Sequence, residues 1–267
     1  MSANVLQKLR VGASEIACRV DGPAGAPAVL LVHGILTDHR AWDAVAARLQ
    51  GRFRVVRPDL RGHGAGSAPA GPYTMQELAD DCAGLLDALA LDRVHFVGSS
   101  LGGMIGQQVG ARHGHRLLSL TLANTAAVQG APASWDERVA VARKSGVAAL
   151  ADGTLQRWFT PGFAERAPQE LARMRELLCG TSVEGFAGCA QAVRDLSQLQ
   201  LLSTIAVPTL VVVGSEDKAT PPEQGRQIAD AIPGARLVTL PAAHQAAVEQ
   251  PQAFCDAWLS FVDGLGS

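Results

Sequence analysis

One segment of this chain indicates its fold, Val94-His95-Phe96-Val97-Gly98-Ser99-Ser100-Leu101-Gly102-Gly103-Met104. It begins with a short apolar run, continues through a G-x-S-x-G pattern and ends in a helix-like segment. A strand, a sharp turn and a helix in this order form an elbow that exposes the hydroxyl of the central serine at the end of a sheet. The pattern therefore predicts that Ser100 is a nucleophile.

Short apolar runs alternate with helix-length segments on both sides of this elbow. The runs cover residues 29–33, 54–59, 94–98, 117–122, 209–214 and 236–240. Several are apolar at consecutive positions, which is typical of strands buried on both faces of a parallel sheet. Between them, residues 74–89 form an amphipathic pattern with a Thr74–Glu77 capping box, and a second helix begins at Pro251. The alternation predicts an α/β fold, a mostly parallel sheet flanked by helices.

Residues 126–195 interrupt the alternation. We find no convincing strand there, only four short helical segments separated by glycines and prolines, Gly153 among them. A helical insertion between two strands of a parallel sheet is expected to cover the strand ends, where such sheets bind ligands. We therefore predict a core of residues 1–125 and 196–267 and a helical cap of residues 126–195.

The composition excludes several classes of protein. Hydrophobic residues make up 48% of the 267 residues and charged residues 18%, which excludes a disordered chain. The net charge of −2 does not favour a nucleic-acid or anionic membrane partner. No signal-like or membrane-spanning run is present, so we expect a cytoplasmic protein with no membrane partner. The sequence does not indicate an oligomeric state.

The five cysteines are scattered and form no C-x-x-C pair. They therefore favour neither a disulfide framework nor a zinc ribbon, and each is expected to be a small buried hydrophobic residue.

A serine nucleophile needs a base, and the base needs an acid that orients it. In elbow enzymes the chain order is serine, acid, histidine. His244 follows the run 236–240 and is the predicted base, whereas His113 and His115 lie at the end of the helix after Ser100. For the acid, the run 117–122 leads to Asn124, which has no carboxylate, and the run 209–214 leads to Asp217, the predicted acid. The neighbouring Glu216 is the alternative.

Two backbone N–H groups are expected to bind the oxyanion of a tetrahedral intermediate. One is the amide of Leu101, directly after the nucleophile and at a helix N-terminus. The second is expected in the loop after the run 29–33, where Ile35 is the favoured donor.

No cofactor or metal is predicted. His33, His63 and His244 share no spacing that places two of them on one rigid face, and we interpret His63 as a loop-packing residue. Neither a Walker loop nor a complete G-x-G-x-x-G pattern occurs.

Together the elbow, His33-Gly34, the stretch Asp59-Leu60-Arg61-Gly62-His63-Gly64, Asp217 and His244 resemble the α/β-hydrolase family over essentially the whole chain. Within that family the sequence is similar to the 3-oxoadipate enol-lactonases. The similar segments are 68–74, 123–127, 157–160 and 220–226. The resemblance implies a cap after the sixth strand and cofactor-free hydrolysis of an enol-lactone in aromatic catabolism. A small ester or lactone is then the only expected partner.

An enol-lactone of an oxoadipate carries a free carboxylate, which is costly to bury unless a cation meets it. We predict that Trp135, Arg138 and Trp158 of the cap bind the substrate, because Arg138 lies one helical turn after Trp135. The competing cations are Arg143, Arg157 and Arg194. The rival functions are a broad carboxylesterase, a ligand receptor on the same fold, and a cofactor-free oxygenase that uses only the histidine and the acid.

Overall fold

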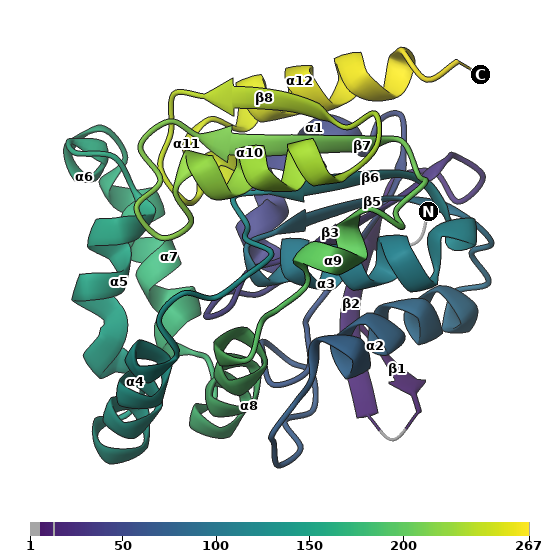
Figure 1. The fold of residues 1–267 in the computed structure, drawn as a ribbon. Helices are drawn as coiled ribbons and strands as arrows, with labels where there is room; N and C mark the ends of the chain where they lie inside the picture. The colour runs from purple at the N-terminus through teal and green to yellow at the C-terminus, as the bar shows by residue number, and fades with distance from the viewer. Residues whose placement is uncertain (1–5, 13, 267) are drawn as a thin grey trace.

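The computed structural model describes residues 6–12 and 14–266 and contains one eight-stranded sheet (Figure 1). The strand order is β1-β2-β4-β3-β5-β6-β7-β8. From β4 to β8 across the sheet all neighbouring strands are parallel, whereas β1 and β2 pair antiparallel at one edge. The strands are β1 Gln7–Val11, β2 Ser14–Asp21, β3 Ala28–Val32, β4 Arg54–Pro58, β5 Val94–Ser99, β6 Leu117–Ala123, β7 Thr209–Gly214 and β8 Arg236–Leu240. The predicted α/β class with a mostly parallel sheet is confirmed.

The six apolar runs correspond to β3–β8, but β1 and β2 are missing from the predicted strands. β1 lies at the edge of the sheet, and only Val11 of its five residues is buried. Its charged residues alternate with apolar ones, and Lys8 forms an ion pair of 2.9 Å with Glu15 of β2. β2 lies inside the sheet and is buried at residues 16–18, but this apolar run is only three residues long and stands between Glu15 and Arg19. The pattern of longer apolar runs that identified the central strands therefore detects neither strand.

The helices flank the sheet and extend beyond one end of it. They are η1 His39–Trp42, α1 Asp43–Leu49, α2 Met75–Ala88, α3 Leu101–Arg112, η2 Gly114–Arg116, α4 Pro132–Ser145, η3 Val147–Leu150, α5 Ala151–Trp158, α6 Phe163–Arg166, α7 Pro168–Cys179, α8 Val183–Arg194, α9 Leu199–Leu202, α10 Pro222–Ala231, α11 Ala246–Glu249 and α12 Pro251–Asp263. The predicted capping box of Thr74 and Glu77 begins α2, and the predicted helix at Pro251 is α12. In the part of the chain that the structure describes, no helix is both long and apolar enough to cross a membrane.

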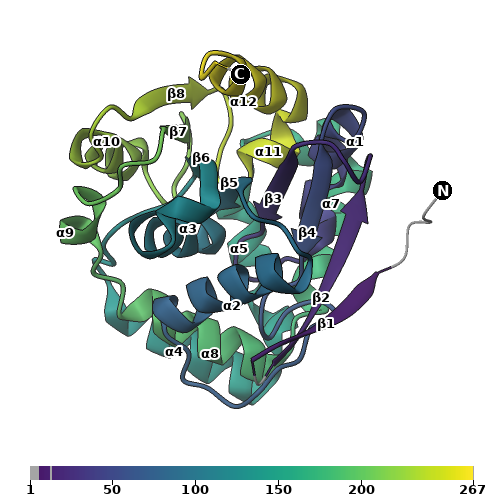
Figure 2. The same ribbon diagram turned by 90° about the vertical axis from the view of Figure 1, so that its right-hand side faces the viewer.

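Two hydrophobic cores lie on the two faces of the sheet, because successive strand residues point to opposite sides. On one face, Leu30 and Val32 pack with α2 and α3. On the other face, Val29 and Leu31 pack with α1 and α12, where Trp258 is buried. Figure 2 shows these two helix pairs on opposite sides of the strands.

Between β6 and β7, the chain first forms a helical insert of α4–α8 and η3 beyond the ends of the parallel strands (Figure 1). It then returns to the sheet through α9. The prediction of four helices was wrong, because the insert contains five α-helices and the 3₁₀ helix η3. Gly146, Gly162 and Gly180 do separate helices, but Gly153 lies exposed inside α5. A glycine on the solvent side of a helix weakens it without ending it, so its sequence signal is ambiguous.

The prediction that every cysteine is buried holds for four of the five. Cys179, the last residue of α7, is exposed. It ends a helix whose apolar side packs through Met174, Leu177 and Leu178.

Candidate active site

The elbow between β5 and α3 holds Ser100 in a strained backbone conformation, with φ 54° and ψ −115°. Residues other than glycine rarely adopt a positive φ. The turn keeps this conformation because the surrounding backbone is packed too closely for the chain to take another one. A Cβ on Gly98 would collide with the carbonyl oxygen of Gly102, and a Cβ on Gly102 would collide with that of Val32. The two glycines of the pattern therefore permit the strand, turn and helix to approach this closely.

The structure brings Ser100, His244 and Asp217 together at the carboxyl end of the sheet. Ser100 follows β5, Asp217 follows β7 and His244 follows β8. The Ser100 Oγ lies 3.0 Å from Nε2 of His244, and Nδ1 of His244 lies 2.9 Å from Oδ2 of Asp217. All three residues are buried. With Nδ1 protonated toward the carboxylate, Nε2 is free to accept the proton of the serine hydroxyl.

The carboxylate of Asp217 accepts hydrogen bonds from several further groups. The amides of Ala219 and Thr220 donate at 2.8 and 2.9 Å, the Thr220 hydroxyl at 2.9 Å and Nδ2 of Asn124 at 3.0 Å. Burial alone would raise the pKa of Asp217. The charge and hydrogen bond of His244, with the bonds from Thr220 and Asn124, outweigh burial and lower the pKa to about 2.

Asn124 and Thr220 are site residues that the sequence reasoning did not assign. Asn124 also donates to the carbonyl of Ala243, the residue before the histidine, at 3.1 Å. It stands at the end of β6 with a positive φ of 46°. The sequence did contain a signal for Asn124: it is a polar residue directly after β6, the strand that pairs with β5. The alternative acid, Glu216, is exposed and does not contact His244.

Glu249 connects the histidine loop to the helical insert. Its buried carboxylate accepts a hydrogen bond from the amide of Ala243 at 3.0 Å. It also accepts bonds from the amide of Thr160, at 3.2 Å, and from the Thr160 hydroxyl. Beside it, the amide of Gln245 donates to the carbonyl of Trp158 at 3.0 Å. The segment after α5 is thus fastened to the loop that carries His244.

The amides of Ile35 and Leu101 are positioned as donors. Both residues line the cavity that Ser100 faces. Within residues 6–12 and 14–266, neither backbone N–H has a hydrogen-bond acceptor. Because buried N–H groups are almost always paired, two free ones beside a serine hydroxyl indicate a place for a negatively charged oxygen.

Two buried histidines hold the loop of Ile35 in place. The amide of Leu60 donates to Nε2 of His33 at 2.9 Å, and the amide of Leu36 donates to Nε2 of His63 at 3.1 Å. Burial lowers the pKa of both side chains, that of His63 to about 3, so both rings are neutral acceptors at physiological pH. His63 therefore packs against the loop that carries Ile35, which lines the cavity of Ser100.

The cavity in front of Ser100 has a volume of about 400 Å³, and Trp135, Arg138 and Trp158 all line it. Arg138 Cζ lies 4.4 Å from the centre of the Trp135 ring, and Nη2 lies 3.5 Å from the hydroxyl of Thr154. In the described part of the chain, Arg138 has no carboxylate partner. Burial, together with the charge of Arg157, lowers its pKa to about 10, and it remains a cation at neutral pH.

The competing arginines divide into two groups. Arg143 pairs with Glu184 at 3.7 Å and Arg194 with Asp136 at 3.1 Å, and neither lines the cavity. Arg157 lines it, as does Lys218, a cation that the sequence reasoning did not single out.

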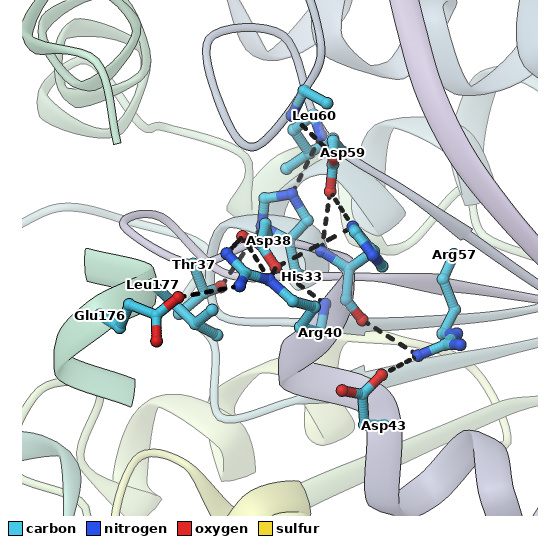
Figure 3. Close-up of polar contacts among 12 residues, drawn as sticks. His33, Thr37, Asp38, Arg40, Asp43, Arg57, Asp59, Leu60, Glu176 and Leu177 are labelled. Atoms are coloured by element: carbon cyan, nitrogen blue, oxygen red, sulfur yellow. Dashed lines mark hydrogen bonds and ion pairs between the residues drawn. The ribbon is translucent and has the colours of Figure 1, made fainter. Parts of the chain in front are cut away.

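One group among the described residues has the composition of a metal site: Asp38, His39 and Asp59. Figure 3 shows the contacts around it. Arg40 holds the carboxylate of Asp38 with three hydrogen bonds of 2.8–3.2 Å. His39 and the amide of Ala65 bond to the carboxylate of Asp59. The two carboxylates of this cluster are therefore already paired with donors of the protein itself. Arg40 also forms an ion pair of 3.2 Å with Glu176 of α7, a contact between the core and the insert.

Comparison with known proteins identifies the family of this chain. Residues 27–251 match the alpha/beta hydrolase fold family, so the chain belongs to that family. It is 35% identical over 87% of its length to 3-oxoadipate enol-lactonase 2 of Acinetobacter baylyi, of which the alignment covers 87%. The crystal structure of an enol-lactonase from Burkholderia xenovorans LB400 superposes with a TM-score of 0.94 at 40% identity, over 96% of this chain and 100% of that one. A hydrolase from Pseudomonas aeruginosa PA01 gives 0.94 at 44% identity, over 98% and 99%. The chain is a hydrolase similar to enol-lactonases and esterases.

Proposed function

We propose that this protein hydrolyses a carboxylic ester or lactone through an acyl-enzyme on Ser100. The observation that carries the proposal is the pair of hydrogen-bond contacts that links Asp217 to His244 and His244 to the Ser100 hydroxyl. Ser100 lines a cavity together with Ile35 and Leu101, whose amides are free. A serine hydroxyl becomes a nucleophile when a positioned base accepts its proton.

In the first half of the reaction, the Ser100 oxygen attacks the carbonyl carbon while Nε2 of His244 takes the proton. The amides of Ile35 and Leu101 donate to the oxyanion of the tetrahedral intermediate. Asp217 stays ionised and stabilises the imidazolium, which then protonates the departing oxygen. In the second half, the oxygen of a water molecule attacks the acyl carbon while Nε2 of His244 takes a proton from that water. The bond between the acyl carbon and the Ser100 oxygen then breaks, and His244 returns the proton to Ser100. No step requires a metal or a nucleotide.

For the substrate we propose 3-oxoadipate enol-lactone, which would be opened to 3-oxoadipate in aromatic catabolism in the cytoplasm. Opening this ring expels an enol, which tautomerises to the ketone of the product. The substrate keeps a free carboxylate, and burying it requires a cation. Arg138 supports this choice, because it lines the cavity in contact with the Trp135 ring and has no carboxylate partner among the described residues.

The test compares 3-oxoadipate enol-lactone with 4-nitrophenyl acetate and other short neutral esters. We expect kcat/KM for the charged lactone to exceed that for the acetate by at least about a hundredfold, a difference of about 2.7 kcal/mol. A preference for the neutral esters would identify a broad carboxylesterase. Absence of turnover on every ester and lactone would contradict the proposal and favour a ligand receptor or an oxygenase on this fold.

A further inference from the structure

A second cavity of about 380 Å³ adjoins the cavity of Ser100. It lies between α5, α6 and the loop after β7, and it shares Arg157 and Lys218 with the first cavity. These two side chains therefore form part of the boundary between the cavities. Both volumes lie within the range of about 300–1,000 Å³ that small-molecule sites occupy.

The two cavities differ in chemistry. The first is lined by three cations, Arg138, Arg157 and Lys218, and by one acid, Glu137, so its charge is positive on balance. The second has an apolar floor, to which Leu155, Phe159 and Phe163 contribute. The rings of Phe159 and Phe163 are stacked with their centres 4.3 Å apart. Charged residues stand around this floor, including an ion pair of Asp152 and Arg175. An apolar floor with a polar rim suits an aryl or alkyl group.

The boundary combines a fixed part with a movable part. Trp158 lines the first cavity, and the next two residues line the second. The backbone of this segment is held by the bonds to Gln245 and Glu249. In contrast, Arg157 and Lys218 are exposed, and within the described residues neither forms an ion pair or a hydrogen bond. Two long side chains without partners can swing aside at little cost, because no contact has to be broken.

We propose that the second cavity is an acyl subsite, which receives the aryl or alkyl end of esters too long for the cavity of Ser100. The acyl chain would run from Ser100 past Arg157 and Lys218 onto the floor formed by Phe159 and Phe163. This proposal rests on the proposed ester hydrolysis. It extends the substrate class from a compact lactone to esters of ω-aryl alkanoic acids.

The test fills the second cavity and compares two esters with the same leaving group, 4-nitrophenyl acetate and 4-nitrophenyl 6-phenylhexanoate. Ala164→Trp on α6 and Gln156→Trp on α5 each alter an exposed residue that lines only the second cavity. Gln169→Trp adds an exposed tryptophan on α7 outside both linings and is the matched control. Both filling variants should lower kcat/KM for the long ester about tenfold or more, because a phenyl group loses its buried surface. The acetate and the control variant should change less than about twofold.

A measurement of binding separates this proposal from the proposed function. Calorimetry with 6-phenylhexanoate should show binding to wild type and at least about tenfold weaker binding to both filling variants, whether or not any ester is turned over. The proposed subsite would be contradicted if the filling variants lowered kcat/KM equally for both esters, or did not lower it for the long ester. An absence of 6-phenylhexanoate binding to wild type would also contradict it. A protein that binds this acid as expected but hydrolyses no ester would keep the subsite and contradict only the proposed function.

Discussion

The end of the sheet and the wall of the cap differ in how their charged groups are paired. At the strand ends, Asp217 accepts hydrogen bonds from four neighbouring groups besides facing His244. In the cap wall, Arg138 and Arg157 have no acid partner within the described residues, and Lys218 beside them has none either. A carboxylate that has all of these donors is preorganised for one reaction. Arg138 is instead a half-buried cation without an acid partner, and its partial burial costs free energy until a ligand neutralises it, whereas Arg157 and Lys218 are exposed. In the function that we propose, the residues at the strand ends carry out the chemistry and those of the cap select the substrate.

The largest effect is expected at the sheet. Ser100→Ala should lower kcat by roughly 10⁴-fold or more on every ester, because a triad acts as a unit. Binding of the carboxylate product should survive, since the cap wall is untouched. Steady-state kinetics and calorimetry on the same preparation measure the two. A variant that keeps most of its activity would remove Ser100 from the mechanism.

A change in the cap wall should instead discriminate between substrates. Arg138→Ala should cost about 2–4 kcal/mol in kcat/KM for the charged lactone and leave 4-nitrophenyl acetate nearly unchanged. Arg143→Ala, on the same helix but paired with Glu184 outside the cavity, is the matched control. Equal losses on both substrates, or none on either, would show that Arg138 does not meet a carboxylate.

Glu249 tests whether the two regions depend on each other. Glu249→Ala leaves the buried amide of Ala243 and the half-buried amide of Thr160 without an acceptor, at a cost of about 1–3 kcal/mol. The histidine loop and the Trp158 wall should then both loosen, so kcat should fall and KM rise, together about tenfold in kcat/KM, on both substrates. Glu249→Gln, which keeps one carbonyl acceptor, should recover part of this. If only KM changes, the carboxylate serves the cap alone.

The smallest effect concerns the loop of Ile35. The buried His63 has a pKa lowered to about 3, whereas an unfolded histidine has about 6.5. Between these values the unfolded chain binds a proton that the folded chain does not, so stability falls as the pH is lowered from about 6.5. His63→Gln should reduce this slope by up to about 1.4 kcal/mol per pH unit. Urea unfolding at pH 7, 6 and 5 measures it, and an unchanged slope would contradict a buried, neutral His63.

The same contrast explains what could be predicted from the sequence. Ser100, Asp217 and His244 each follow a buried strand, and parallel strands end at one edge of a sheet, so their meeting could be expected from chain order alone. The central strands were predictable because burial on both faces requires continuous apolar runs. The hairpin of β1 and β2 was not, because β1 is an exposed edge strand and the apolar run of β2 spans only residues 16–18.

The partners of the site were harder to predict. Asn124, Thr220 and Glu249 act through hydrogen bonds whose geometry depends on how separate loops pack together. In the cap, Arg138 was selected through its spacing from Trp135, but the sequence could not show that Arg143 is paired or that Lys218 reaches the cavity. Local spacing determines which side chains share a helix face, and only tertiary packing determines which of them find a partner.

The most direct test of the account is to identify the residue that becomes acylated. A 4-nitrophenyl phosphonate should react with one equivalent of protein, and peptide mass spectrometry should place the adduct on Ser100. The Ser100→Ala variant should remain unlabelled under the same conditions. An adduct on another residue in wild type, with Ser100 unmodified and activity lost, would contradict the assignment of Ser100 as the nucleophile.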